Sequence, residues 1–162
     1  MGGSMLFRVG SRKPALLGRE DWTLLSMATA KRSLLPIQLQ KSLYLLGQRF
    51  PKLTAGAFYT FRAISSGQFS EEVSRDANLF AMTGLVSIDV LDPGGRAYRV
   101  TPKGLERAQE LEKRADPDAI QFLRRTVAWV RTRTVDQLLH GPVEPASPAP
   151  LPTTKPPLLR RR

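Results

Sequence analysis

The feature that most constrains the fold of this chain is the stretch of residues 69–104, where a short helix, a hairpin and a second helix start follow one another. Helical spacing predicts a helix over residues 71–83, and Gly84 ends it. Residues 86–90 and 97–100 alternate apolar and polar side chains, which is typical of half-buried strands.

Turn and cap residues favour the same assignment. Asp92-Pro93-Gly94 supplies a fixed φ and a glycine that tolerates positive φ. Thr101-Pro102 is a cap followed by a first-turn proline. Apolar side chains at helical spacing predict flanking helices over about residues 20–33, 36–50, 102–115 and 118–140. The predicted fold class is therefore mostly α with a small β-hairpin (α+β), a winged helix-turn-helix with extra N- and C-terminal helices.

The connection between the second helix and residue 69 carries weaker signals. The aromatic and β-branched run Phe58-Tyr59-Thr60-Phe61 predicts a short strand. Ser65-Ser66-Gly67 predicts a turn, and Ser70 is the expected cap of the helix that follows.

Composition divides the chain into three parts. Residues 1–18 are rich in Gly, Ser and Arg and are expected to be a flexible basic arm. Residues 19–141 are expected to form the winged-helix domain. Prolines punctuate residues 142–162, which end on three arginines, so a disordered Pro-rich basic tail is expected there.

The net charge of the chain indicates which chemical class of binding partner is favoured. A formal net charge of +11 favours a polyanion, with nucleic acid ahead of an acidic protein or a membrane surface. The absence of cysteine excludes disulfides and thiolate zinc sites and makes a cytoplasmic location the simplest expectation. No apolar run approaches the roughly 20 residues that span a bilayer, so no membrane partner is expected.

Three segments together resemble a known family. Residues 39–46 look like the "LQKLLYLL" helix of small winged-helix proteins related to YwgA and to the Panacea (SocA-like) antitoxin domain. Residues 69–86 look like that family's "YSxELxRDLxxLxxxGLI" element, and residues 98–104 are similar to its "YxLTxKG". The resemblance covers about residues 35–140. It implies a winged-helix fold without catalysis, in a DNA-binding regulator or in an antitoxin-like module that holds another protein.

The helix over residues 71–83 is the candidate recognition helix. Ser74, Arg75 and Asn78 lie on its outward side, where Arg75 suits guanine and Asn78 suits adenine through bidentate contacts. The carboxylates of the same helix belong to Glu71, Glu72 and Asp76. Because carboxylates repel phosphates, groove entry needs nearby cations. The alternative is a solvated helix whose acidic first turn suits its dipole.

Three further residues complete the predicted DNA-binding set. Arg96 and Arg99 lie beside the turn and on the second strand, where a wing meets phosphate or the minor groove. Lys41 lies off the apolar stripe of the second helix. A solvated edge charge is the alternative for the two wing arginines.

The last predicted helix carries two aromatic residues a heptad apart, Phe122 and Trp129. We expect them to pack across a symmetry axis in a homodimer. The arginines of that helix remain open between a phosphate-tracking face and a solvated face.

Motifs for catalysis are missing from the sequence. It has one histidine, His140, no nucleophile elbow, no phosphate-binding loop and no spaced set of metal ligands. We therefore expect no enzyme activity, no cofactor and no metal. The predicted function is that of a non-enzymatic winged-helix DNA-binding protein and transcriptional regulator. The alternative is an antitoxin-like partner-binding module that uses its acidic helix and an apolar groove near Leu39 and Tyr44.

Overall fold

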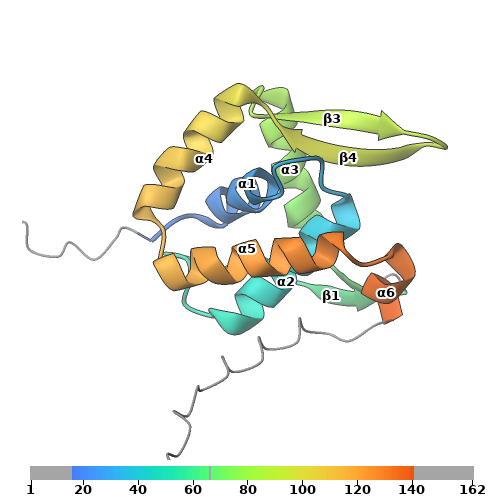
Figure 1. Ribbon diagram of the computed structural model, residues 1–162. Coiled ribbons are helices and arrows are strands. Elements are labelled where there is room, and N and C mark those ends of the chain that lie inside the picture. The colour runs from blue at the N-terminus through green and yellow to red at the C-terminus, as the bar shows by residue number, and fades with distance from the viewer. Residues whose placement is uncertain (1–15, 66, 141–162) are drawn as a thin grey trace, which may run out of the picture.

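A computed structural model describes residues 16–65 and 67–140 of the chain (Figure 1). Within these residues, six helices are combined with two antiparallel strand pairs, which confirms the mostly α, α+β class. The elements are α1 (Arg19–Thr29), α2 (Pro36–Arg49), β1 (Arg62–Ile64), β2 (Gly67–Phe69), α3 (Glu71–Met82), β3 (Val86–Leu91), β4 (Gly95–Val100), α4 (Pro102–Arg114), α5 (Pro117–Arg131) and α6 (Val135–His140).

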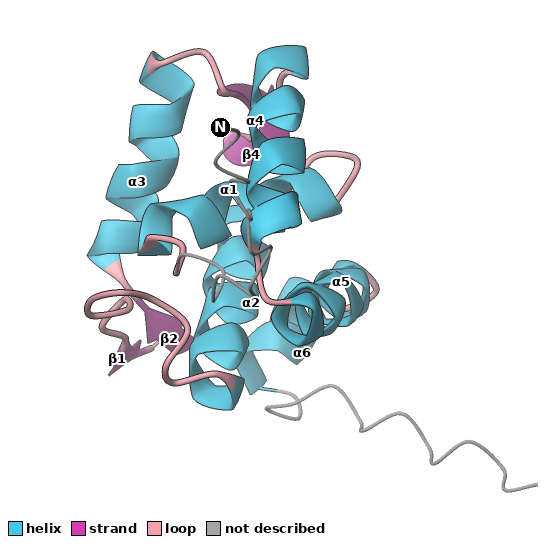
Figure 2. Cartoon of the chain, turned by 90° about the vertical axis from the view of Figure 1, so that its left-hand side faces the viewer, coloured by secondary structure: helices cyan, strands magenta, loops and turns pink. Residues whose placement is uncertain are grey.

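Helix α1 is the centre of the packing. It contacts α2, α3, α4, α5 and β4. Figure 2 shows α3 on one side of α1 and α2, with α4 and α5 on the other side. The largest fully buried side chains come from α1, α2, α3, α4, α5 and the α1–α2 connection, and include Trp22, Leu34, Leu43, Leu46, Val73, Leu111 and Leu123. One hydrophobic core therefore joins the two sides.

The β3–β4 hairpin projects from one end of the helices (Figure 1). Val86, Ile88 and Val90 share one face, as the alternation predicts. Val86 is buried, whereas Val90 is 81% exposed because the hairpin extends past the helices near its tip.

A third backbone segment joins the base of this hairpin. Leu34, in the link between α1 and α2, pairs with Tyr98 of β4 as an antiparallel bridge. Each residue donates its N–H to the other's carbonyl oxygen at 2.8 Å. The β3–β4 hairpin is thereby attached to the centre of the molecule through backbone hydrogen bonds.

The caps read from the sequence are largely present. The Thr101 hydroxyl accepts a hydrogen bond from the Gly104 N–H at 3.1 Å, and Pro102 begins α4. Gly84 follows α3 with φ +79°, a conformation that disfavours other residues. The apolar stripe of α2 is buried at Leu39, Leu43 and Leu46.

The predicted strand at Phe58–Phe61 is wrong. These residues form no strand, and the pairing lies further on, where Arg62 faces Phe69 and Ile64 faces Gly67. The aromatic side chains are instead used in packing. Phe61 meets Tyr44 edge-on at 5.4 Å between ring centres, and Phe58 meets Tyr59 at 5.2 Å. Their aromatic content reflects burial rather than backbone pairing.

The single helix expected over residues 118–140 is also wrong, because α5 ends at Arg131 and α6 begins at Val135. The Thr132 hydroxyl donates to the Trp129 carbonyl at 2.7 Å. Thr134 and Gln137 then cap each other reciprocally: the Thr134 hydroxyl accepts from the Gln137 N–H (3.1 Å), and the Gln137 amide oxygen accepts from the Thr134 N–H (3.0 Å). This capping box starts a new helix.

The ends of the chain bear on the domain boundaries. Leu17 is buried, so packing against the helices begins two residues before the predicted domain start. Residues 1–15 of the basic arm predicted over residues 1–18, and the whole predicted tail over residues 142–162, lie outside the described residues. None of the helices that the structure describes is long and apolar enough to cross a bilayer.

Gly104 should be indispensable for docking α4 against the wing. A Cβ at this position would overlap the backbone oxygen of Leu85, which cannot rotate away. We expect Gly104→Ala to lower the free energy of unfolding by about 3 kcal/mol, measured by urea denaturation. Gly56→Ala is the matched control, since no atom lies within 4 Å of its Cβ. Equal effects of the two substitutions would contradict this packing.

Candidate nucleic-acid interface

The start of α3 is fixed by a side chain from α2. The Gln40 amide donates to the Ser70 carbonyl at 2.9 Å and accepts from the Ser70 N–H at 3.0 Å. Ser70 occupies the N-cap position, but its own hydroxyl makes no hydrogen bond, so the expected side-chain cap is wrong. Val73 stands where a capping box needs Glu or Gln, and Gln40 performs that role from another helix.

The carboxylates of α3 are paired with cations. Arg19 of α1 lies 3.0 Å from the Glu72 carboxylate and 3.7 Å from that of Asp76. Arg62 of β1 lies 2.5 Å from Glu71. Much of the repulsion that these three carboxylates would exert on an approaching phosphate is thereby neutralised.

A buried hydroxyl extends the network behind α3. The Tyr59 hydroxyl donates to Oδ2 of Asp76 at 2.5 Å and lies 2.8 Å from the Thr23 hydroxyl. The Arg19 guanidinium stands 5.0 Å from the centre of the Tyr59 ring. Burial, followed by the hydrogen bond to Asp76, raises the pKa of Tyr59 far above its ordinary value.

The outward face of α3 carries two of the predicted site residues. Arg75 and Asn78 are exposed, together with Leu79 at 50% and Met82 at 83%. Ser74 is half-buried, and its hydroxyl lies 3.3 Å from the Gln40 amide nitrogen. Ser74 therefore belongs to the contact between α2 and α3, while Arg75 and Asn78 face solvent together.

The two arginines of the β3–β4 hairpin differ in whether a carboxylate pairs with them. Arg96 is exposed on β4 near the hairpin tip, opposite Val90. Arg99 pairs with Asp89 of β3 at 2.5 Å. Arg96 is therefore the more available of these two arginines to a phosphate.

Lys41 lies half-buried on α2, and burial lowers its pKa. The groove expected near Leu39 and Tyr44 is filled within the chain, because Leu39 is buried and Tyr44 packs against Phe61.

The aromatic pair predicted for a dimer interface also has partners within the chain. Phe122 meets Phe50 of the α2 end at 5.6 Å between ring centres. The Arg133 guanidinium stacks 5.3 Å from the centre of the Trp129 ring. Both aromatic side chains remain half-buried.

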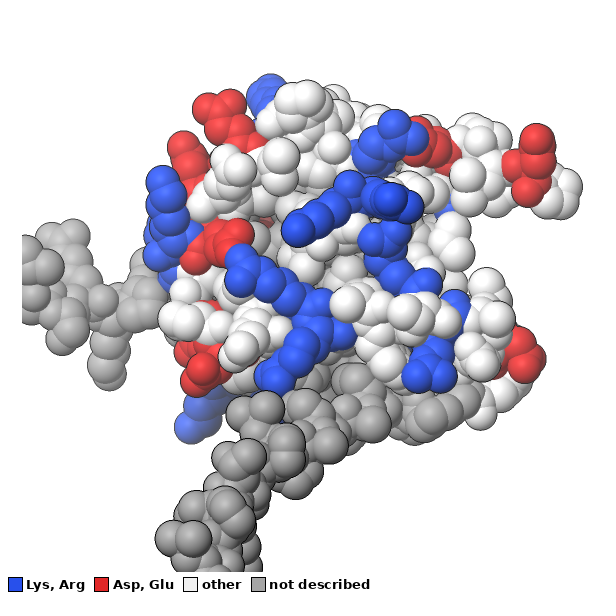
Figure 3. Space-filling view, in the orientation of Figure 1, with Lys and Arg blue, Asp and Glu red and all other residues white. Residues whose placement is uncertain are grey.

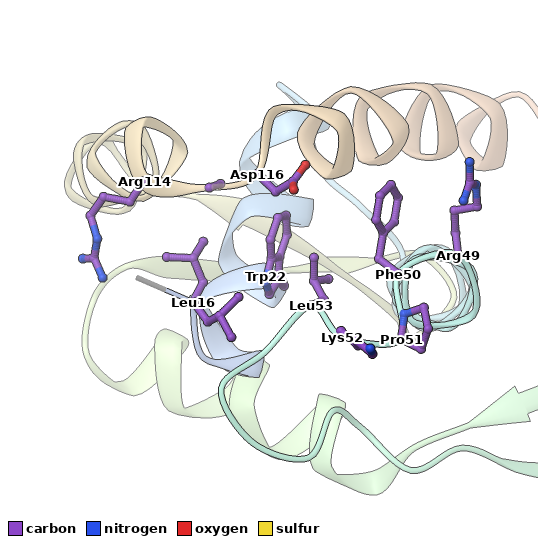
Figure 4. Close-up of a pocket in the computed structure, with 11 residues that line it drawn as sticks. Leu16, Trp22, Arg49, Phe50, Pro51, Lys52, Leu53, Arg114 and Asp116 are labelled. Atoms are coloured by element: carbon purple, nitrogen blue, oxygen red, sulfur yellow. The ribbon is translucent and has the colours of Figure 1, made fainter. Parts of the chain in front are cut away.

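A small hollow of about 330 Å³ lies away from α3, between the start of α1, the end of α2 and the α4–α5 junction (Figure 4). Trp22 and Phe50 form its apolar wall, and Arg49, Lys52 and Arg114 lie around it. The indole N–H of Trp22 is buried without a hydrogen-bond acceptor among the described residues.

No clusters of His, Asp or Glu in the described part of the chain have metal-binding geometry. Comparisons of the chain with protein-family models, curated proteins and solved structures gave no match.

Sequence reasoning missed the residues that hold α3 in place, namely Gln40, Arg19, Tyr59 and Arg62. Arg19 and Glu72 are 53 positions apart, and no local pattern links them. Gln40 alone offered a signal, because it is a buried polar residue beside the apolar stripe of α2.

Tyr59→Phe should destabilise the protein by about 2 kcal/mol, because it removes a buried hydrogen bond to a carboxylate. Tyr44→Phe is the control, since no hydrogen bond of the described residues uses the Tyr44 hydroxyl. Chemical denaturation at neutral pH measures both. A loss no larger than that of Tyr44→Phe would argue against the network.

Alkaline pH gives a second test of Tyr59. Its raised pKa means that the folded protein keeps the phenol proton after the unfolded chain has lost it. The resulting stability is complete below the ordinary tyrosine value of about 10 and is lost as pH rises above it. We expect the free energy of unfolding to fall less steeply above that pH in Tyr59→Phe than in the natural sequence. Parallel curves would contradict the raised pKa.

Proposed function

We propose that this protein is a non-enzymatic winged-helix protein that binds duplex DNA and acts as a transcriptional regulator. The observation that carries the proposal is the pairing of the α3 carboxylates with Arg19 and Arg62, which leaves Arg75 and Asn78 exposed side by side. An acidic helix would be repelled from the major groove, but a neutralised helix that presents an arginine and an asparagine suits it.

The order of elements supports the winged-helix assignment. Helix α1, the bridge at Leu34, α2, α3 and the β3–β4 hairpin follow in the sequence typical of that fold. The link between α2 and α3 differs from an ordinary helix-turn-helix, because residues 50–70 and the β1–β2 hairpin replace a turn of about three or four residues. Gln40 fixes the two helices across this longer link.

The role proposed for each residue depends on how far its side chain is exposed to solvent. Arg75 and Asn78 contact base edges, and Arg96 contacts a phosphate from the wing. Arg99 shares its charge with Asp89, and Ser74 and Lys41 contribute less because each is half-buried. A DNA-binding role and the absence of cysteine both favour a cytoplasmic location.

A partner-binding module of the antitoxin kind is the second candidate. The observation in its favour is the exposure of Leu79 and Met82 on the same face of α3 as Arg75. Apolar side chains beside an arginine are common in protein interfaces. If this second candidate is correct, Met82→Ala weakens a stoichiometric complex with a partner protein. Arg75→Ala then leaves the affinity for duplex DNA unchanged.

Arg75→Ala should weaken binding to a preferred duplex about tenfold, because a bidentate base contact contributes about 1–3 kcal/mol. Gel-shift titrations measure the dissociation constants. Arg107→Ala is the matched control: it removes the same charge from an exposed residue on α4 that pairs with Glu110. If the two variants bind equally well, α3 does not read the duplex.

Arg96→Ala should act on affinity rather than on sequence preference. The loss of one phosphate contact lowers the slope of log K against log salt by about one. Salt titrations on specific and random duplexes measure this slope. A change confined to the specific duplex would instead make Arg96 a base-reading residue.

A further inference from the structure

A groove opens on the side of the molecule opposite α3. Helices α4 and α5 diverge there, with α1 and the residues after it between them (Figures 1 and 2). Its volume is about 820 Å³. Its apolar lining comes from Leu25, Ala28, Ala108, Ile120 and Val127. Leu105 lies at its edge with 46% of its surface exposed.

The rim of this groove is cationic. Lys31, Arg32, Arg124 and Arg131 line it, against one carboxylate from Glu112. Glu112 pairs with Arg124, and Arg131 donates to the Ala30 carbonyl at 2.5 Å. Lys31 and Arg32 form no ion pair with the described residues. Figure 3 looks onto this face and shows Lys and Arg side chains gathered across its middle.

Lys31 is held in a backbone conformation that lysine rarely adopts. Its φ is +56°, the left-handed value that glycine or asparagine usually supplies after a helix. Lysine at this position costs about 1 kcal/mol relative to glycine. The chain therefore carries a charge at the groove rim at some expense of stability, as residues in functional sites often do.

We infer that this groove binds an acidic amphipathic helix of a partner protein. The apolar floor accepts leucine or phenylalanine side chains, Lys31 and Arg32 pair with carboxylates at the margins of the same helix, and Arg124 and Arg131 add to the positive field of the rim. Two helices with a third beneath them offer the ridges and grooves against which a further helix packs.

Charge and shape argue against other occupants. The segments outside the described residues carry Arg8, Arg12 and Lys13 at one end and Lys155 with Arg160, Arg161 and Arg162 at the other, so both repel a cationic rim. Duplex DNA offers phosphates but no side chains for the apolar floor. Because α3 faces the opposite side, an occupant of the groove leaves the exposed face of α3 open to duplex DNA.

The test uses the full chain and a fluorescein-labelled peptide of about 16 residues, roughly the length of α5 when helical. The peptide carries leucine at helical spacing and glutamate on both flanks of that stripe. A scrambled peptide of the same composition is its control. Fluorescence anisotropy should show saturable binding of the designed peptide and at least tenfold weaker binding of the scrambled one. Failure of the designed peptide to bind, or equal binding of the two, would overturn the inference.

The Lys31→Gly variant distinguishes an effect on peptide binding from an effect on the stability of the protein. It removes a rim charge and relieves the backbone, so peptide affinity should fall about threefold while Tm stays equal or rises. Leu105→Glu should weaken binding further, because it places a carboxylate at the apolar edge. Arg107→Ala lies on α4 outside the groove lining and should leave peptide affinity unchanged. Should Lys31→Gly leave peptide affinity unchanged, the groove is not a peptide site.

Discussion

The ion pairs of Arg19 with Glu72 and Asp76 fix the orientation of α3 against the central helix α1. Arg19 begins the central helix α1, and both carboxylates belong to α3. Tyr59 closes the same network through its hydroxyl and its ring. Because these groups are partly buried, their attraction is less screened than that of a surface pair. The direction in which α3 faces solvent depends on this contact and on the Gln40 clamp.

Because of these ion pairs, the charges counted along the sequence of α3 do not describe the charge of its exposed face. Counted along the chain, α3 is an acidic helix and a poor candidate for DNA. In three dimensions its carboxylates pair with arginines from α1 and β1, and its exposed face presents Arg75 and Asn78 beside Leu79 and Met82. Net charge per helix is thus a poor guide where partners come from distant segments.

Local signals gave most of the elements correctly, and the errors have physical causes. The elements that were predicted correctly depend on neighbouring residues only. Gly84 follows the end of α3, Thr101 caps α4, and an apolar stripe marks the buried side of α2. The strand predicted over residues 58–61 is wrong because burial and strand pairing favour the same residue types. The break at Thr134 was readable from its spacing to Gln137 but lay within a continuous apolar stripe. The pairing of Arg19 with α3 and the groove beside Lys31 arise only when distant segments meet.

The bridge at Leu34 has a mechanical consequence. Lys31 at the groove rim and Leu34 at the base of the β3–β4 hairpin belong to one segment and are three residues apart. Any occupant that shifts this segment therefore also pulls on β4, because Leu34 pairs with Tyr98 through two backbone hydrogen bonds. Coupling between two binding sites is reciprocal. If a groove occupant changes the affinity of the hairpin for its own ligand by some factor, that ligand changes the affinity of the groove for its occupant by the same factor.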